Sequence, residues 1–200
     1  KENKKRGKML SHIKKLVEKF LSHDKKIQII SHYDSDGMTS AAIMASALQR
    51  LDKKFSIKII KQLEKEFIEE LTKNNKDAIF LFLDLGSGNL QELNMLQNEI
   101  YILDHHEINK NPKINENIIL INPHLFNEEN LCSSCLTYLF VKEISKENKD
   151  LANLAIIGMV GDMLEKNIGK LWNSILNDAE LIIKKGLLLY PATRPLNKTL

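Results

Sequence analysis

Short apolar runs alternate with longer amphipathic stretches along the chain. The runs are rich in Ile and Leu and do not alternate in polarity, which is typical of strands buried on both faces of a parallel sheet. We predict strands over residues 27–31, 55–60, 78–84, 100–103 and 118–121. The pattern favours an α/β fold in which a parallel sheet of about five strands is sandwiched by helices.

The stretches around these strands repeat apolar residues at helical spacing. They predict helices over residues 9–21, 39–51, 64–74, 89–98, 133–147 and 151–164. Ser87 or Asn89 is expected to cap the fourth helix, and Ser133 or Ser134 the fifth. At 200 residues the chain suits one domain, so we assign the N-terminal helix, residues 1–22, to the same domain as residues 23–200.

The composition indicates a packed globular domain but does not indicate what the protein binds. The sequence is 43% hydrophobic and 28% charged, as in packed domains, and its net charge of +3 does not by itself indicate nucleic acid. It has no apolar run of 18 residues and no secretory signal at its start, so we expect a cytoplasmic protein without a membrane partner. The motif "CSSC", from Cys132 to Cys135, lacks the second pair of a zinc site. A redox pair and two small residues on a first helical turn both remain open, and we favour the second.

Three predicted strands end in carboxylates or imidazoles. The first leads into "SHYDSDG", the third into "LDLGSG" and the fourth into "LDHHE". Ligands of open parallel sheets bind at the carboxyl ends of the strands, so these side chains are expected to meet at one edge. The candidates are His32, Asp34, Asp36, Asp84, Asp104, His105 and His106. In an extended segment the first three would face one side, before Gly37 turns the chain into a helix.

Oxygen and nitrogen ligands without a thiolate suit Mn²⁺ or Mg²⁺ better than Zn²⁺. Because there are more carboxylates than one cation needs, we expect two ions, about 3.5–4 Å apart and sharing a carboxylate, in a centre for metal-assisted hydrolysis of a phosphate ester. Asp162 joins the set because it lies late in an apolar helix, where an unpaired carboxylate is costly. A solvent-facing acid at the helix end is the alternative, but Gly158 and Gly161 allow close packing and favour a site residue.

The motifs "HYDSDG", "LDLGSG", "LDHHE" and "GMVGDM", in this order, resemble the four motifs of the DHH phosphoesterase superfamily. They cover residues 31 to about 164. Within the superfamily the sequence is most similar to archaeal RecJ-like nucleases, including those that associate with the GINS replication complex. That similarity extends to "INPHLF" and to "KKGLLLYPATRPLNKTL" near the end of the chain.

The resemblance implies a division of the metal ligands. One ion would be bound by His32, Asp34 and Asp84, and the other by Asp36, Asp84, His105 and Asp162, so that Asp84 is the bridge. Bacterial RecJ has an acidic residue at the position of His32, whereas archaeal members resemble this sequence. We therefore retain His32 as a ligand, with a supporting role behind the ligands as the alternative.

The resemblance also implies roles beyond metal binding. Asp104 would orient the neighbouring His105, and His106 would contact the scissile phosphate or the bridging water. Asp84, Asp104 and His106 are thus the expected catalytic residues. Arg194, in "ATRPL", would contact a phosphate or a site carboxylate, unless it is a surface arginine.

The function implied is a Mn²⁺- or Mg²⁺-dependent exonuclease that hydrolyses single-stranded DNA or RNA by a two-metal mechanism with a bridging hydroxide. One alternative is an inactive replication subunit that binds GINS. Another is a DHH phosphatase for short oligonucleotides, cyclic dinucleotides or pyrophosphate. Family nucleases usually continue into a DHHA1 domain, and nothing here resembles one. We expect either a truncated catalytic domain or a separate DHHA1-type subunit as partner.

Overall fold

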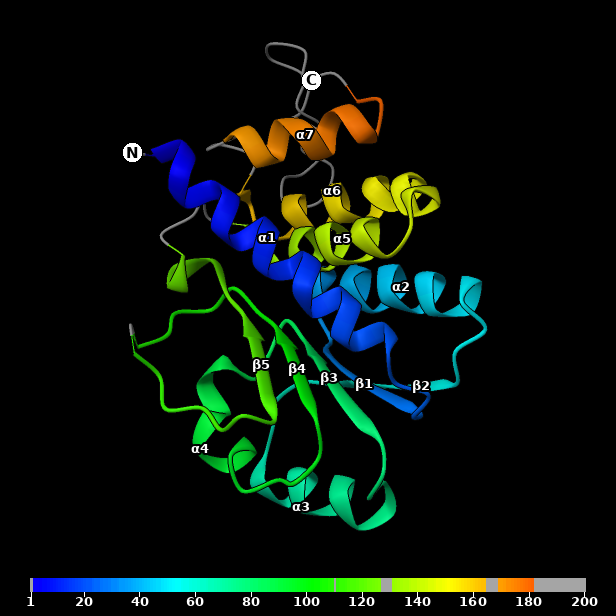
Figure 1. Cartoon of the computed structure of the whole chain (residues 1–200), viewed down its shortest axis with the longest axis vertical. Coiled ribbons are helices and arrows are strands. Elements are labelled where there is room, and N and C mark those ends of the chain that lie inside the picture. The colour runs from blue at the N-terminus through cyan, green and yellow to red at the C-terminus, as the bar shows by residue number, and fades with distance from the viewer. Residues whose placement is uncertain (1, 110, 127–130, 165–168, 182–200) are drawn as a thin grey trace, which may run out of the picture.

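Five parallel strands form the sheet at the centre of the fold (Figure 1). The computed structural model describes residues 2–109, 111–126, 131–164 and 169–181. The strands are β1 (Ile27–His32), β2 (Phe55–Ile60), β3 (Ile79–Leu83), β4 (Ile100–Leu103) and β5 (Ile118–Ile121), in the order β2-β1-β3-β4-β5. Every neighbouring pair is parallel. The predicted α/β fold with a five-stranded parallel sheet is confirmed.

Helices cover both faces of the sheet. They are α1 (Glu2–Leu21), α2 (Ser35–Arg50), α3 (Lys65–Asn74), α4 (Leu90–Leu93), α5 (Ser133–Ile144), α6 (Ala152–Gly161) and α7 (Lys170–Asp178), with short 3-10 turns η1 (Ser87–Asn89), η2 (Pro123–Leu125) and η3 (Lys146–Leu151). Helices α1, α2, α5, α6 and α7 lie on one side of the sheet, and α3 and α4 lie on the other (Figure 1).

Each face of the sheet has its own hydrophobic core. Ile29, Leu81 and Tyr101 point into the core under α1, α2, α5 and α6, to which α1 contributes Met9 and Ile13. The intervening strand residues point into the smaller core under α3 and α4. All residues of β3, β4 and β5 are buried, which explains why their sequences do not alternate in polarity.

Helix boundaries differ from the prediction more than strand boundaries do. Helix α2 begins at Ser35, four residues before the predicted start, because the Asp34 carboxylate caps it. Residues 89–98 contain only the four-residue α4, and the predicted caps Ser87 and Asn89 form no side-chain cap bond. Beyond α4 the Asn98 side chain donates to three backbone carbonyls of residues 75–78, which fixes a loop in place of a longer helix. Helix α7 was not predicted.

The start of α5 also departs from expectation. Cys132 occupies its N-cap position, so Ser133 and Ser134 lie inside the first turn instead of capping it. Cys132 and Cys135 are both buried and free. Within the described residues, no helix is both long and apolar enough to cross a membrane.

Close packing at the turn from β1 into α2 predicts a large cost for a side chain at Gly37. A Cβ there would lie 2.7 Å from the Cβ of His32 and closer still to the His32 carbonyl oxygen. The Ser31 hydroxyl donates to the Gly37 carbonyl (2.7 Å), which ties the turn to the sheet. We expect Gly37→Ala to lower the free energy of unfolding by roughly 1–3 kcal/mol, measured by urea denaturation.

Gly88→Ala is the matched control, because a Cβ at Gly88 would meet no atom within 4 Å. That variant should stay within about 0.5 kcal/mol of wild type. Equal effects of the two substitutions would contradict the packing argument.

Candidate metal centre

The turn between β1 and α2 supplies three polar side chains. His32 ends the strand, Asp34 accepts a hydrogen bond from the Gly37 N–H (2.9 Å), and Asp36 lies in the first helical turn. The three are therefore placed by a strand-to-helix turn, and the prediction of one extended segment is wrong. The cause is local: the Asp34 carboxylate satisfies a free N–H of α2 and starts the helix at Ser35.

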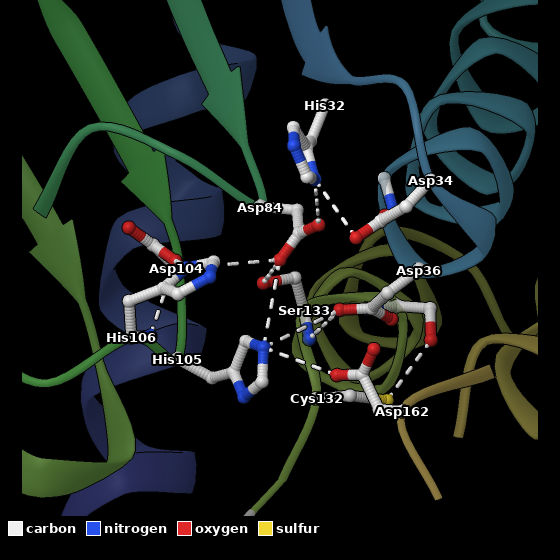
Figure 2. Close-up of polar contacts among 12 residues, drawn as sticks. His32, Asp34, Asp36, Asp84, Asp104, His105, His106, Cys132, Ser133 and Asp162 are labelled. Atoms are coloured by element: carbon white, nitrogen blue, oxygen red, sulfur yellow. Dashed lines mark hydrogen bonds and ion pairs between the residues drawn. The ribbon is translucent and has the colours of Figure 1, made fainter. Parts of the chain in front are cut away.

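Asp84 follows β3 in a left-handed backbone conformation, with φ of 60°. Few residues other than glycine adopt this region, although Asp and Asn tolerate it, and such strain is concentrated at functional sites. Only 1% of Asp84 is exposed. Its Oδ1 accepts a hydrogen bond from the Ser133 hydroxyl (3.0 Å), while Oδ2 lies 3.3 Å from His32 Nδ1. Asp84 therefore lies at the middle of the cluster (Figure 2).

Asp104, the first residue after β4, contacts His106 and not His105. Asp104 Oδ1 accepts hydrogen bonds from the backbone N–H and the ring Nδ1 of His106, the latter at 2.7 Å. Its Oδ2 accepts a hydrogen bond from the Ser87 N–H (2.9 Å). The expectation that Asp104 orients His105 is therefore wrong, because the chain turns back after Asp104 and brings the ring of His106 onto its carboxylate.

His105 instead joins the other carboxylates. Its Nε2 lies 3.1 Å from Asp162 Oδ2, 3.5 Å from Asp84 Oδ1 and 3.8 Å from Asp36 Oδ2. Asp162 is the C-cap residue of α6. Helix α6 approaches closely because Gly158 has no side chain; a Cβ there would lie 2.7 Å from Asp36 Oδ1. The close packing predicted from the glycines is thus present, and it brings Asp162 into the cluster (Figure 2).

The N-terminus of α5 binds the Asp36 carboxylate. The backbone N–H groups of Ser133 and Ser134 donate to its two oxygens at 2.7 and 2.9 Å, and Asp36 is fully buried. Free N–H groups and the helix dipole make such a terminus favourable for an anion. Sequence reasoning missed both serines as site residues. The available pattern was a helix beginning "SSC" after Leu131 and Cys132, and its two serines were interpreted only as caps.

Three overlapping groups of side chains have the spacing of metal ligands. They are His32, Asp34 and Asp84; Asp36, His105 and Asp162; and Asp84, His105 and His106. Among the described residues, His32 Nδ1, Asp84 Oδ2 and Asp162 Oδ2 are buried yet form no hydrogen bond. Each lies against another ligand instead: His32 Nδ1 is 2.8 Å from Asp34 Oδ2 and 3.3 Å from Asp84 Oδ2, and Asp162 Oδ2 is 3.1 Å from His105 Nε2. Such crowding of buried polar atoms without a regular hydrogen bond is costly, and cations bound within the ligand groups would satisfy these atoms. The donor set of carboxylate oxygens and imidazole nitrogens fits Mn²⁺ or Mg²⁺.

Crowding of carboxylates changes their protonation. Burial and the negative charges of Asp36 and Asp34 raise the pKa of Asp84 to about 11. Burial and the charge of Asp162 also raise the pKa of Asp36, despite the N–H groups of α5. A divalent cation compensates this charge and displaces the retained protons, so cation binding should strengthen as pH rises.

The two histidines are biased towards the charged form. Burial opposes it for His105, but the carboxylates of Asp162 and Asp36 raise its pKa above the usual value. The hydrogen bond to Asp104 raises the pKa of His106. Burial favours the neutral form of Asp104, yet the contacts from His106 and the Ser87 N–H keep its pKa below the usual value. Asp104 and His106 therefore form a charged pair beside the cluster.

Two further residues complete the account of the sequence predictions. Arg194, the expected phosphate contact, lies outside the described residues. His124 lies after β5, and its Nε2 is 3.1 Å from the backbone oxygen of His105, so it supports the loop behind that ring. All the other candidate residues gather at the carboxyl edge of the sheet (Figure 2).

Comparison with known proteins adds an independent finding. The model of the DHH family, N-terminal domain, matches residues 26–159. An uncharacterized protein of Methanocaldococcus jannaschii is 38% identical over 172 residues, which are 83% of this chain and 39% of that protein. The single-stranded-DNA-specific exonuclease RecJ of Thermus thermophilus is 27% identical over 192 residues, which are 89% of this chain and 27% of that protein.

Among solved structures, exonuclease RecJ bound to manganese shares the fold with a TM-score of 0.69 at 22% identity. The match covers 85% of this chain and 46% of that one. The chain thus spans less than half the length of each of these relatives.

The raised pKa of Asp84 predicts a pH-dependent cost to the metal-free protein. In the folded state the pKa of this carboxyl is about 11, whereas in the unfolded chain it returns to its ordinary value of 3.8. Stability from this group is therefore fully present below the lower value and is lost as pH rises towards the upper one, by up to about 1.4 kcal/mol per pH unit. Asp84→Asn removes the titration, and Asn tolerates the left-handed backbone.

We expect metal-free wild type to lose stability relative to Asp84→Asn between about pH 5 and about pH 9, measured by urea denaturation with a chelator present. Added Mn²⁺ should stabilise wild type and not the variant. Asp77→Asn, at an exposed position, is the control and should follow wild type. Parallel stability curves for wild type and Asp84→Asn would contradict the prediction.

Proposed function

Because the chain belongs to the DHH family, we propose that it is a divalent-metal-dependent phosphodiesterase that hydrolyses single-stranded DNA or RNA from an end. The similarity to a single-stranded-DNA-specific exonuclease of Thermus thermophilus supports the hydrolysis of single strands. The observation that carries the proposal is the set of ligand groups that overlap at Asp84 and at His105 and contain three buried polar atoms without a hydrogen bond. A fold kept only as a scaffold has no need for such costly atoms.

The ligand groups support two neighbouring cations. His32, Asp34 and Asp84 would hold one ion. Asp36, His105 and Asp162 would hold the other, with Asp84 between them, since its Oδ1 lies 3.5 Å from His105 Nε2 and its Oδ2 lies 3.3 Å from His32 Nδ1. When bound, Mn²⁺ or Mg²⁺ would lower the pKa of the attacking water and offset the negative charge on the phosphoryl oxygens.

The protein's own contribution is rigid placement. Ser133 holds Asp84 through its hydroxyl and Asp36 through its N–H, so one residue fixes carboxylates from two elements. Asp104 accepts the hydrogen bond from Nδ1 of His106 and favours the charged ring. The Nε2–H group of His106 is then left as a donor. We assign this group to a phosphoryl oxygen, where a preorganised donor stabilises charge that develops during attack.

The central experiment assays one panel of substrates with Mn²⁺: labelled single-stranded DNA and RNA, duplexes, dinucleotides, a cyclic dinucleotide and pyrophosphate. We expect hydrolysis of single strands from one end, and at least a roughly 10³-fold lower rate for Asp84→Asn. Asp77→Asn is the matched control.

The other outcomes separate the alternatives. Hydrolysis of pyrophosphate or dinucleotides alone would replace the exonuclease with a small-substrate phosphatase. Failure to bind Mn²⁺ in calorimetry would instead favour an inactive, scaffold-type subunit. Near-normal hydrolysis by Asp84→Asn would exclude the assigned metal centre.

The pairing of Asp104 with His106 makes a prediction about pH dependence. Its hydrogen bond raises the pKa of His106, so the charged donor persists to higher pH than in a free imidazole. Asp104→Asn should remove that support while sparing the metal ligands. We expect kcat to fall by roughly 10–100-fold, and the loss of activity on the alkaline side to move to lower pH.

Mn²⁺ affinity, measured by calorimetry, should stay close to wild type in this variant. A uniform loss of activity with an unmoved pH profile would show that Asp104 acts only as structural support. A loss of Mn²⁺ binding would place it among the ligands.

A further inference from the structure

A cavity of about 290 Å³ opens beside the metal centre. Its lining includes His32, Asp84 and His106. It also includes residues outside the ligand groups, namely Lys61 in the segment after β2 and Glu107 after β4. This volume is near the lower limit for small-molecule pockets, so the cavity has room for about one nucleotide unit and not for a length of strand.

The lining of this cavity suits sugar and phosphate better than a base. No Phe, Tyr or Trp lines it among the described residues, so apart from the histidines of the centre it offers no ring for base stacking. Lys61 is its one Lys or Arg, and it is exposed and makes no ion pair within the described part of the chain. A free ammonium beside a phosphodiesterase centre suits a backbone phosphate, which Lys binds as a point charge.

Glu107 is the unexpected feature, since a carboxylate repels a polyanion. It is exposed, and no described residue donates a hydrogen bond to it or forms an ion pair with it. It also lines a second, larger cavity of about 940 Å³ under α4, whose lining includes Lys113. Glu107 therefore stands where two cavities meet, each with a lysine of its own. Between two phosphates of a strand lies a sugar, and a sugar hydroxyl can donate to a carboxylate.

We infer that the smaller cavity binds the ribose-phosphate of one nucleotide, with Lys61 on the phosphate and Glu107 accepting a hydrogen bond from the ribose 2′-hydroxyl. Acidic residues bind ribose hydroxyls in this way in dinucleotide-binding folds, and the 2′-hydroxyl is the group by which a protein distinguishes RNA from DNA. The inference rests on the proposed function, which it sharpens: the substrate is RNA in preference to DNA, and its bases are not read.

The test measures binding of AMP and dAMP to the full chain loaded with Mn²⁺, by calorimetry, and needs no hydrolysis. Wild type should bind AMP about tenfold more tightly than dAMP, and CMP within about twofold of AMP. Glu107→Ala should weaken AMP to the level of dAMP and leave dAMP unchanged. Lys61→Ala should weaken both by about tenfold.

Two matched variants control for the loss of charge. Lys58→Ala removes a neighbouring lysine of β2 that lies over the Phe67 ring and lines neither cavity. Glu116→Ala removes an exposed carboxylate away from both cavities. Both should bind the two nucleotides as wild type does, and thermal unfolding should show that all four variants are folded.

The results separate this inference from the proposed function. Equal binding of AMP and dAMP by wild type, no detectable binding of either, or an unchanged preference in Glu107→Ala would overturn the inference, even if single strands are hydrolysed. Conversely, a preference for AMP that depends on Glu107 supports it, even if the protein hydrolyses no strand and the proposed function fails.

Discussion

The contact between the Asp36 carboxylate and the N-terminus of α5 is the interaction on which the rest of the centre depends. It allows a carboxylate to be fully buried by giving both of its oxygens a backbone donor. Through it the turn after β1 is joined to α5, and the Ser133 hydroxyl extends the connection to Asp84 at the end of β3. Helix α6 then packs against the same point at Gly158 and delivers Asp162. Segments far apart in the sequence are thereby fixed around one anion.

That arrangement leaves a charge imbalance that the protein does not resolve by itself. The carboxylates of Asp36 and Asp84 both have raised pKa values, and three buried polar atoms form no hydrogen bond within the described residues. Buried carboxylates without a compensating positive charge are unfavourable, and bound cations would supply that charge. The strained backbone at Asp84 fits the same view, since strain is retained where it places a functional group.

Much of this arrangement is readable from the sequence, for identifiable reasons. Strands β3, β4 and β5 were predicted because both faces of the sheet are covered there, which makes their sequences almost uniformly apolar. The cluster was predicted because polar residues at the ends of parallel strands must meet. What failed depends on local hydrogen bonds: Asp34 caps α2 and ends the extended segment early, and Asp104 contacts His106 through a tight turn. The contribution of Ser133 depends on the approach of α5 to Asp36 in the folded chain. The residues around Asp36 contain no pattern that predicts this contact.

The proposed chemistry and the inferred choice of substrate rest on different kinds of residue. Of the proposed metal ligands, Asp36 and Asp84 are buried and the other four are partly buried. They are held by contacts among β1, β3, β4, α5 and α6, so we expect a substitution there to disturb both stability and catalysis. Lys61 and Glu107 are exposed, follow strand ends and belong to neither hydrophobic core. Because loops tolerate change that cores do not, we expect substitutions at these two positions to alter the inferred preference for the sugar without moving the proposed metal centre.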